Sequence, residues 1–129
     1  MNKKVKGFTL VEIMIVVAVI ALLAAIAIPN LLRAKVAANE SSAQSTLKSI
    51  ANALETYTIS NGVYPSDTTS LIGAAPPYLN KDYFSGPYNG YIFTASLSDY
   101  DYTITAVPSA ANFGVNSFTI TTGAVLTTN

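Results

Sequence analysis

The sequence predicts an α+β fold in which one long N-terminal helix packs on a C-terminal antiparallel sheet of three to four strands. An uncharged apolar run occupies residues 13–28, and an amphipathic pattern without Pro or Gly continues from 33 to about 60. Short alternating runs then fill residues 91–129. The helix therefore has an apolar half and an amphipathic half, and the amphipathic half carries the stripe that a sheet can cover.

Composition limits the function classes that the chain can belong to. It has 129 residues, enough for one small domain, of which 50% are apolar and 11% are charged. Cys and His are both missing from the sequence, which excludes disulfides, thiol nucleophiles, His-based catalysis and Cys/His zinc sites. The basic residues beyond the N-terminus are too scattered for a nucleic-acid-binding face. We therefore expect no enzyme activity, no cofactor and no nucleic-acid partner.

The apolar run is long enough to cross a membrane. Residues 8–32 form about 25 residues, or roughly 37 Å of helix, against a bilayer core of about 30 Å. Three lysines precede the run and predict a cytoplasmic N-terminus with the remainder exported. Hydropathy alone leaves two readings open, a single-pass signal anchor or a secretory signal peptide cleaved after Ala25–Ala27. A lone acid at the start of the run, Glu12, is costly in lipid and indicates a function or a partner.

A third reading rests on a specific motif. A basic leader ends in a glycine, and Phe, a hydroxyl residue, two aliphatic residues, Glu and about fourteen apolar residues follow it. In this chain these positions are Gly7, Phe8, Thr9, Leu10, Val11, Glu12 and residues 13–26. With this motif the chain resembles the superfamily of type IV pilins and type II secretion pseudopilins. Pro29 also falls where many members carry a helix-bending proline. The fold expected above is then the pilin fold.

The resemblance implies roles for the matched residues. A prepilin peptidase would remove the leader, residues 1–7, by cutting between Gly7 and Phe8, and would methylate the new amine of Phe8. The Glu12 carboxylate would pair with the Phe8 ammonium of a neighbouring subunit in a low-dielectric filament core; the simpler alternative is a Glu that snorkels to the membrane interface. Pro29 would let the helix loosen as subunits pack, or would only kink it.

The resemblance also implies partners and a location. The partners would be further copies of the chain in a helical homopolymer, the prepilin peptidase, and an inner-membrane assembly platform with its assembly ATPase. The precursor would reside in the bacterial inner membrane, with residues 33–129 forming a head outside the cytoplasm. After assembly the subunit would be part of a surface pilus or of a periplasmic pseudopilus.

The amphipathic half of the helix, 33–60, shows apolar residues at spacings of three and four. They are Ala43, Leu47, Ile50, Leu54 and Tyr57. Gly62 is typical of a helix C-terminus, and residues 61–90, rich in Gly and Pro, are expected to form a loop. Within that loop, Ala75–Leu79 is expected to dock on the core.

The C-terminal part is expected to form a sheet that packs one face on this stripe. Runs rich in β-branched and aromatic residues predict strands at 91–95, 102–107, 115–121 and 124–127, with a turn at Gly123 before the last of them.

Asp99 and Asp101 form the single pair of closely spaced carboxylates in the sequence. In an extended chain, residues two apart point to one side, and calcium prefers oxygen ligands of this kind. We therefore consider them calcium candidates, although a solvated turn between two strands explains them equally well. No other metal site is expected.

Three functions stay open at this level. The first is a structural subunit of a type IV pilus, serving adhesion, motility or DNA uptake. The second is a major pseudopilin acting in protein export by type II secretion; the third is a non-polymerising domain on a single membrane anchor. Many type IV pilins carry a C-terminal disulfide loop, which this chain without Cys lacks, and the calcium-loop pattern of the major pseudopilins is not found either.

Overall fold

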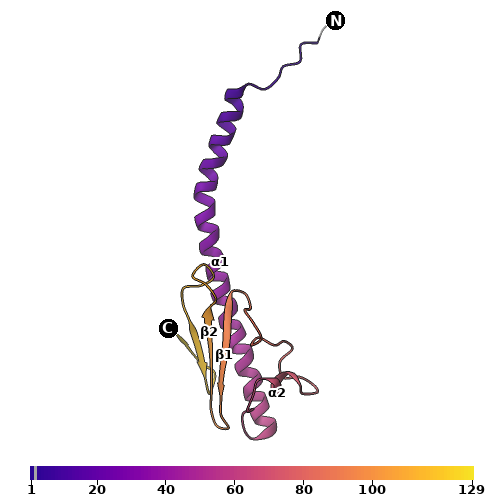
Figure 1. Ribbon diagram of the computed structural model, residues 1–129, viewed down its shortest axis with the longest axis vertical. Coiled ribbons are helices and arrows are strands. Elements are labelled where there is room, and N and C mark those ends of the chain that lie inside the picture. The colour runs from indigo at the N-terminus through magenta and orange to yellow at the C-terminus, as the bar shows by residue number, and fades with distance from the viewer. Residues whose placement is uncertain (2) are drawn as a thin grey trace. The chain divides into compact units, whose positions relative to one another are not determined.

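The computed structural model describes Met1 and residues 3–129, so Asn2, in the expected leader, lies outside the described residues. The chain forms two compact units, Met1–Ala34 and Lys35–Asn129. Helix α1 (Leu10–Asn61) contributes to both units. The later elements are the short helix α2 (Thr69–Ile72) and the strands β1 (Tyr91–Leu97), β2 (Tyr102–Pro108), β3 (Phe118–Thr121) and β4 (Val125–Thr128) (Figure 1).

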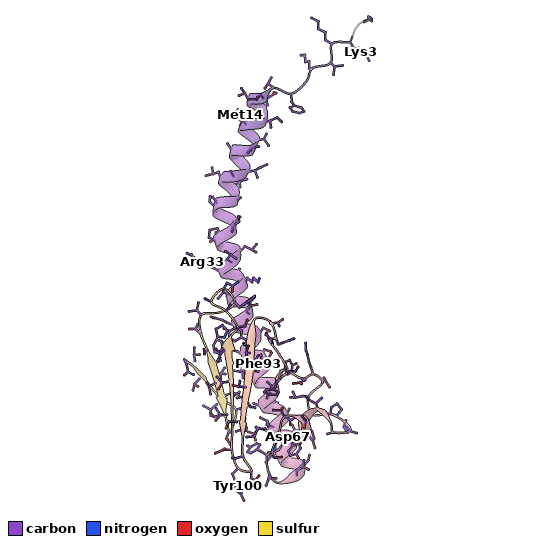
Figure 2. All side chains as sticks on the ribbon, viewed as in Figure 1. Lys3, Met14, Arg33, Asp67, Phe93 and Tyr100 are labelled. Carbon is purple, nitrogen blue, oxygen red and sulfur yellow. The ribbon has the colours of Figure 1, made fainter. Side chains whose placement is uncertain are left out.

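The first unit consists of residues without regular structure followed by the apolar part of α1. Side chains around Met14 project from the helix on all sides (Figure 2). The most apolar 18-residue window of α1 has a mean hydropathy of 3.0, and none of it is buried. By length and composition this helix can cross a membrane. It also continues without a break through Pro29.

The second unit packs the amphipathic part of α1 on one face of the sheet. The predicted stripe is confirmed, because four of its members are fully buried and Tyr57 packs against the same core. On the sheet side, β1 and β2 alternate between buried and more exposed positions, as a half-buried sheet requires. Phe93 and Ile104 are examples of side chains that face the core.

The sheet is an antiparallel meander in the order β1-β2-β3-β4. Its register places Ala95, Ile104, Ile120 and Leu126 in one row across all four strands, on the face that covers α1. A one-residue slip would turn this row to solvent, so the apolar pattern itself fixes the register. The predicted helix-then-sheet architecture is thereby confirmed.

The third strand is shorter than the sequence predicts. It begins at Phe118, whereas the alternating pattern predicted a start at Val115. The N–H groups of Val115 and Asn116 donate to the carboxylate of Glu40 on α1, at 2.9 and 3.1 Å. A side chain far away in sequence therefore takes the hydrogen bonds that a longer strand would have used.

Residues 61–90 form an ordered loop around α2. The predicted docking of Ala75–Leu79 is confirmed, since Leu79 is buried and the N–H groups of Tyr78 and Leu79 donate to the Leu71 carbonyl. The loop ends in a tight turn at Asn89-Gly90, both with positive φ, which brings Tyr88 opposite Tyr91. Asn-Gly is the favoured pair for such a turn because both residues tolerate left-handed dihedrals.

Candidate processing and assembly site

The expected cleavage point lies in non-helical chain just before α1. Residues 3–9 have no regular secondary structure, and the Phe8 side chain is 86% exposed. A methyl group added at Gly7 would meet nothing within 4 Å, and Gly7 does not need a positive φ. Among the residues that the structure describes, no contact explains why this position is a glycine.

Thr9 and Glu12 close the start of α1 with reciprocal hydrogen bonds. The Thr9 N–H and hydroxyl donate to Glu12 Oε2 at 2.7 and 2.8 Å, and the Glu12 N–H donates back to Thr9 Oγ1 at 3.3 Å. This is a capping box, which satisfies backbone donors that the first helical turn leaves open. Sequence analysis missed it, although a Thr three residues before a Glu at the head of an apolar run is its signature.

The site residues expected from the motif meet around one small hollow of about 220 Å³. Lys6, Gly7, Phe8 and Glu12 line it. Glu12 is thus close to the bond expected to be cut while its Oε2 is held by Thr9. Pro29 lies further along α1 and does not share the hollow; its missing N–H leaves the Ala25 carbonyl without its usual helical partner.

In the second unit, Glu40 clamps the loop between β2 and β3 to α1. Its carboxylate accepts the N–H groups of Val115 and Asn116 and the Asn116 side-chain amide, across 75 or more residues of sequence. The two backbone donors hold the pKa of Glu40 below its usual value. Burial, followed by the negative charge of Glu40, raises the pKa of Tyr91, whose hydroxyl donates to the Asn116 carbonyl at 2.8 Å.

Two further contacts fix the same loop. Asn39 donates to the Phe113 carbonyl at 2.9 Å, and the Lys35 ammonium lies 5.4 Å from the centre of the Phe113 ring. Gly114 leaves room for Tyr91, because a Cβ at this position would come within 2.1 Å of the Tyr91 hydroxyl oxygen. The loop is therefore held to α1 by Asn39 and Lys35, and Gly114 lets it pass close to Tyr91 on β1.

Glu55 on α1 forms a second clamp, which holds the turn between β3 and β4. One carboxylate oxygen accepts the hydroxyl of Tyr102 and the N–H of Gly123, and the other accepts the hydroxyl of Tyr64, each at 3.1 Å. Burial raises the pKa of Tyr102 to about 12, and the nearby Glu55 carboxylate adds to the effect. The β3–β4 turn, in which Gly123 and Ala124 have positive φ, is thereby tied to α1.

Neither clamp was recognised from the sequence, where both acids only marked the polar character of the helix. A usable signal existed for Glu40, which lies three residues before Ala43 and hence in phase with the buried stripe. An acid on the buried side of an amphipathic helix needs hydrogen-bond donors from elsewhere in the fold.

Asp99 and Asp101 lie in the exposed turn between β1 and β2. The Asp101 carboxylate accepts the Ser98 hydroxyl, and the Asp99 carbonyl accepts the Tyr64 N–H at 3.1 Å. Within the part of the chain that the structure describes, no three Asp, Glu, His or Cys side chains are grouped closely enough to hold a metal ion. These contacts fit the turn interpretation, and calcium binding stays a prediction.

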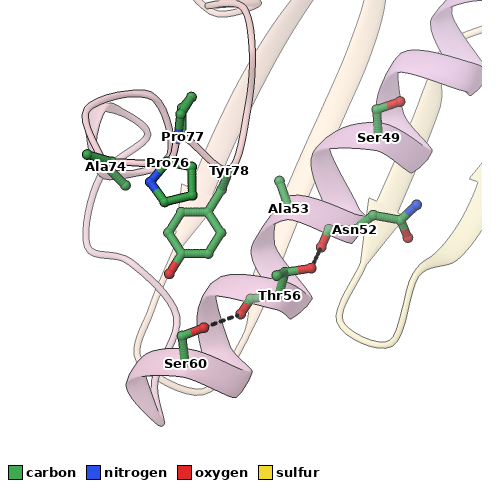
Figure 3. Close-up of a pocket in the computed structure, with 10 residues that line it drawn as sticks. Ser49, Asn52, Ala53, Thr56, Ser60, Ala74, Pro76, Pro77 and Tyr78 are labelled. Carbon is green, nitrogen blue, oxygen red and sulfur yellow. Dashed lines mark hydrogen bonds between the residues drawn. The ribbon is translucent and has the colours of Figure 1, made fainter.

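A groove in the second unit is neutral and has a volume of about 710 Å³. Helix α1 lines one side with Ser49, Asn52, Ala53, Thr56 and Ser60, and the loop lines the other with residues 74–78 (Figure 3). The hydroxyls of Thr56 and Ser60 donate to α1 carbonyls one turn back. No titratable acid or base lines the groove apart from the Tyr78 phenol, so the groove has no evident reaction chemistry.

Comparisons with known sequences cover nearly the whole chain. The family profile described as the prokaryotic N-terminal methylation motif matches residues 2–28, and that of type II secretion system protein G matches residues 30–118. The first profile therefore covers the same residues as the capping box and the hollow, and the second covers most of the clamped unit.

Three curated relatives illustrate the similarity. The type IV wide pilus major component PilA4 of Thermus thermophilus is 34% identical over 89% of this chain and 91% of that protein. The type IV major pilin protein PilA of Myxococcus xanthus is 36% identical over 90% of this chain and 54% of that protein. The type II secretion system core protein G of Vibrio cholerae is 34% identical over 70% of this chain and 62% of that protein. The chain thus spans almost all of the first relative and less than two thirds of the other two.

Proposed function

The chain belongs to the superfamily of type IV pilins and type II secretion pseudopilins, and we propose that it is the structural subunit of a type IV pilus. The observation that carries this proposal is the motif Gly7–Glu12 at the head of an apolar helix whose side chains are exposed all around. Such a helix requires lipid or other apolar helices as its surroundings. A membrane supplies them before assembly, and copies of the same helix supply them in a filament.

In the proposed life cycle the N-terminus is cytoplasmic, and a prepilin peptidase hydrolyses the Gly7–Phe8 bond. Water adds across this amide, which leaves a carboxylate on Gly7 and an ammonium on Phe8, and a methyl donor then supplies the methyl group of the Phe8 amine. Gly7 supports this proposal because no contact with the described part of the chain requires a glycine there. A narrow protease cleft does favour one, since glycine offers no side chain to obstruct it.

The proposed role of Glu12 is to pair with the Phe8 ammonium of a neighbouring subunit, which would set the register of an incoming helix. Such a pair need not add net stability over an apolar residue, but a misplaced helix would leave the charge unpaired. Replacing Glu12 by Ala or Lys should abolish filaments while the subunit stays in the membrane. Glu12→Gln is the matched control for charge, because an amide oxygen can still accept the Thr9 N–H. Normal filaments formed by Glu12→Ala would refute the pairing role.

A pilus is favoured over a pseudopilus by the extent of the matches. The Thermus and Myxococcus pilins align over 89% and 90% of this chain, and the Vibrio protein G over 70%. The loop between β2 and β3, residues 109–117, contains no acidic residue that could bind calcium, and Glu40 on α1 holds it by hydrogen bonds.

The proposed machinery comprises an assembly platform and an assembly ATPase in the inner membrane.

Protein export is the second candidate, because the protein G profile matches residues 30–118. Mass spectrometry of the mature N-terminus tests both filament proposals against a non-polymerising membrane anchor. A chain that starts at N-methylated Phe8 agrees with a filament subunit, and an intact Met1 would contradict one. Imaging of sheared filaments then separates long surface pili from short periplasmic pseudopili, and deletion of the gene should remove motility or adhesion in the first case and secretion in the second.

A further inference from the structure

The Thr9–Glu12 capping box ends immediately after the bond that is proposed to be cut. We propose that this box fixes where α1 begins and thereby keeps the Gly7–Phe8 bond in the extended form that the peptidase needs. Thr9 is then a positioning residue for the processing reaction. This inference rests on the proposed function, because it presupposes that a peptidase cuts at Gly7–Phe8.

The geometry around Thr9 supports the proposal. Helix α1 starts at Leu10, and Thr9 is the last residue outside it. The Thr9 hydroxyl takes part in two bonds at once, since it accepts the Glu12 N–H and donates to Glu12 Oε2. A residue that caps in this way has non-helical dihedrals, so the chain before it cannot continue the helix. Phe8 and the bond before it therefore stay outside the helix, and Phe8 is exposed.

Without the cap, the residues that flank the bond are able to join the helix. In an apolar environment backbone groups must pair with one another, which favours extension of α1 toward its N-terminus. Gly7 is a poor helix former, so the extension should stop near Phe8. That extension is sufficient to matter, because the amide of Phe8 is the scissile amide. A protease cleaves chain that it can draw out into its cleft, and helical chain must first unfold there.

The test compares four Thr9 variants of the full chain in membrane vesicles with the peptidase added. Thr9→Ala and Thr9→Val both lack a capping oxygen, and Ala also favours helix. We expect about fivefold slower cleavage for Ala and a smaller decrease for Val. Backbone amide exchange of the uncut chain should show the helix advancing toward Phe8 in Thr9→Ala. Thr9→Ser retains the cap and should be cut within about twofold of the native rate.

Thr9→Asn separates capping from direct recognition of a hydroxyl by the peptidase. Asn is a good N-cap but has no hydroxyl, so it should be cut at close to the native rate. Slow cleavage of Thr9→Asn, or cleavage of Thr9→Ala at the native rate or faster, would overturn the inference while leaving the proposed function in place. If the native chain itself is not cut at Gly7–Phe8, the proposed function fails and the inference fails with it.

Discussion

Glu55→Ala should destabilise the Lys35–Asn129 unit strongly, because it removes one acceptor shared by three donors. Gly123 is exposed, and water can replace the carboxylate there. The hydroxyls of Tyr64 and Tyr102 belong to side chains that are only 7% and 1% exposed, so water can replace the carboxylate poorly at Tyr64 and hardly at all at Tyr102. A buried donor left unsatisfied costs about 1–3 kcal/mol. Two such donors, one of which reaches some solvent, give a loss of about 2–3 kcal/mol.

The assay can use the full chain in detergent micelles, since all eight tyrosines lie between residues 57 and 102 and Trp is absent. The near-UV circular dichroism of tyrosine therefore reports on this unit alone. For a domain of this size, 2–3 kcal/mol corresponds to a decrease in Tm of roughly 10–20 °C. Glu55→Gln keeps a side-chain acceptor and should lose less than half as much. A Tm for Glu55→Ala within about 3 °C of the native value would refute the argument that the clamp stabilises the fold.

Four further predictions concern the same unit, and the Tm by tyrosine dichroism measures each. Gly114→Ala should lower the Tm by roughly 5–15 °C, because overpacking against the buried Tyr91 costs about 1–3 kcal/mol; an unchanged Tm would show that the loop moves aside freely. Ala124→Gly should raise the Tm by a few degrees, because Ala124 has a φ of 59° and left-handed dihedrals cost an L-residue about 1 kcal/mol; a lower Tm would contradict this. The stability contributed by Glu40, whose pKa is lowered on folding, should be fully present above pH 4.5 and lost as the pH falls through the folded pKa, and Glu40→Gln should flatten that decline. The stability linked to Tyr102, whose pKa is raised, should be present below about pH 10 and lost as the pH rises toward about 12.

The sequence predicted those parts of the fold that follow from local periodicity. The helical stripe from Ala43 to Tyr57 and the alternation in β1 and β2 each repeat one physical rule, apolar residues inward, over many residues. The turn at Gly123 could also be predicted, because the preference of glycine for positive φ depends on that residue alone.

The features that could not be predicted depend on pairs of residues far apart in sequence. The start of β3 was misplaced because Glu40 takes the N–H groups of Val115 and Asn116, and no pattern near residue 115 indicates an acid 75 positions earlier. The Glu55 clamp depends on a partner 68 positions away. The capping box is a different case, since its signal is local and was present in the sequence, but the resemblance directed attention to Glu12 as an assembly residue only.

The two carboxylate clamps also determine when the fold can be completed. A ribosome makes α1 first, whereas the backbone donors to Glu40 lie at Val115 and Asn116 and the backbone donor to Glu55 lies at Gly123. During most of its synthesis the nascent chain therefore exposes both the bare stripe of α1 and two acids that must be satisfied by water. Contacts this distant in sequence also close slowly. A chain truncated before residue 123 would thus lack the Gly123 donor to Glu55 and strand β4, whose Leu126 packs against the core that covers α1.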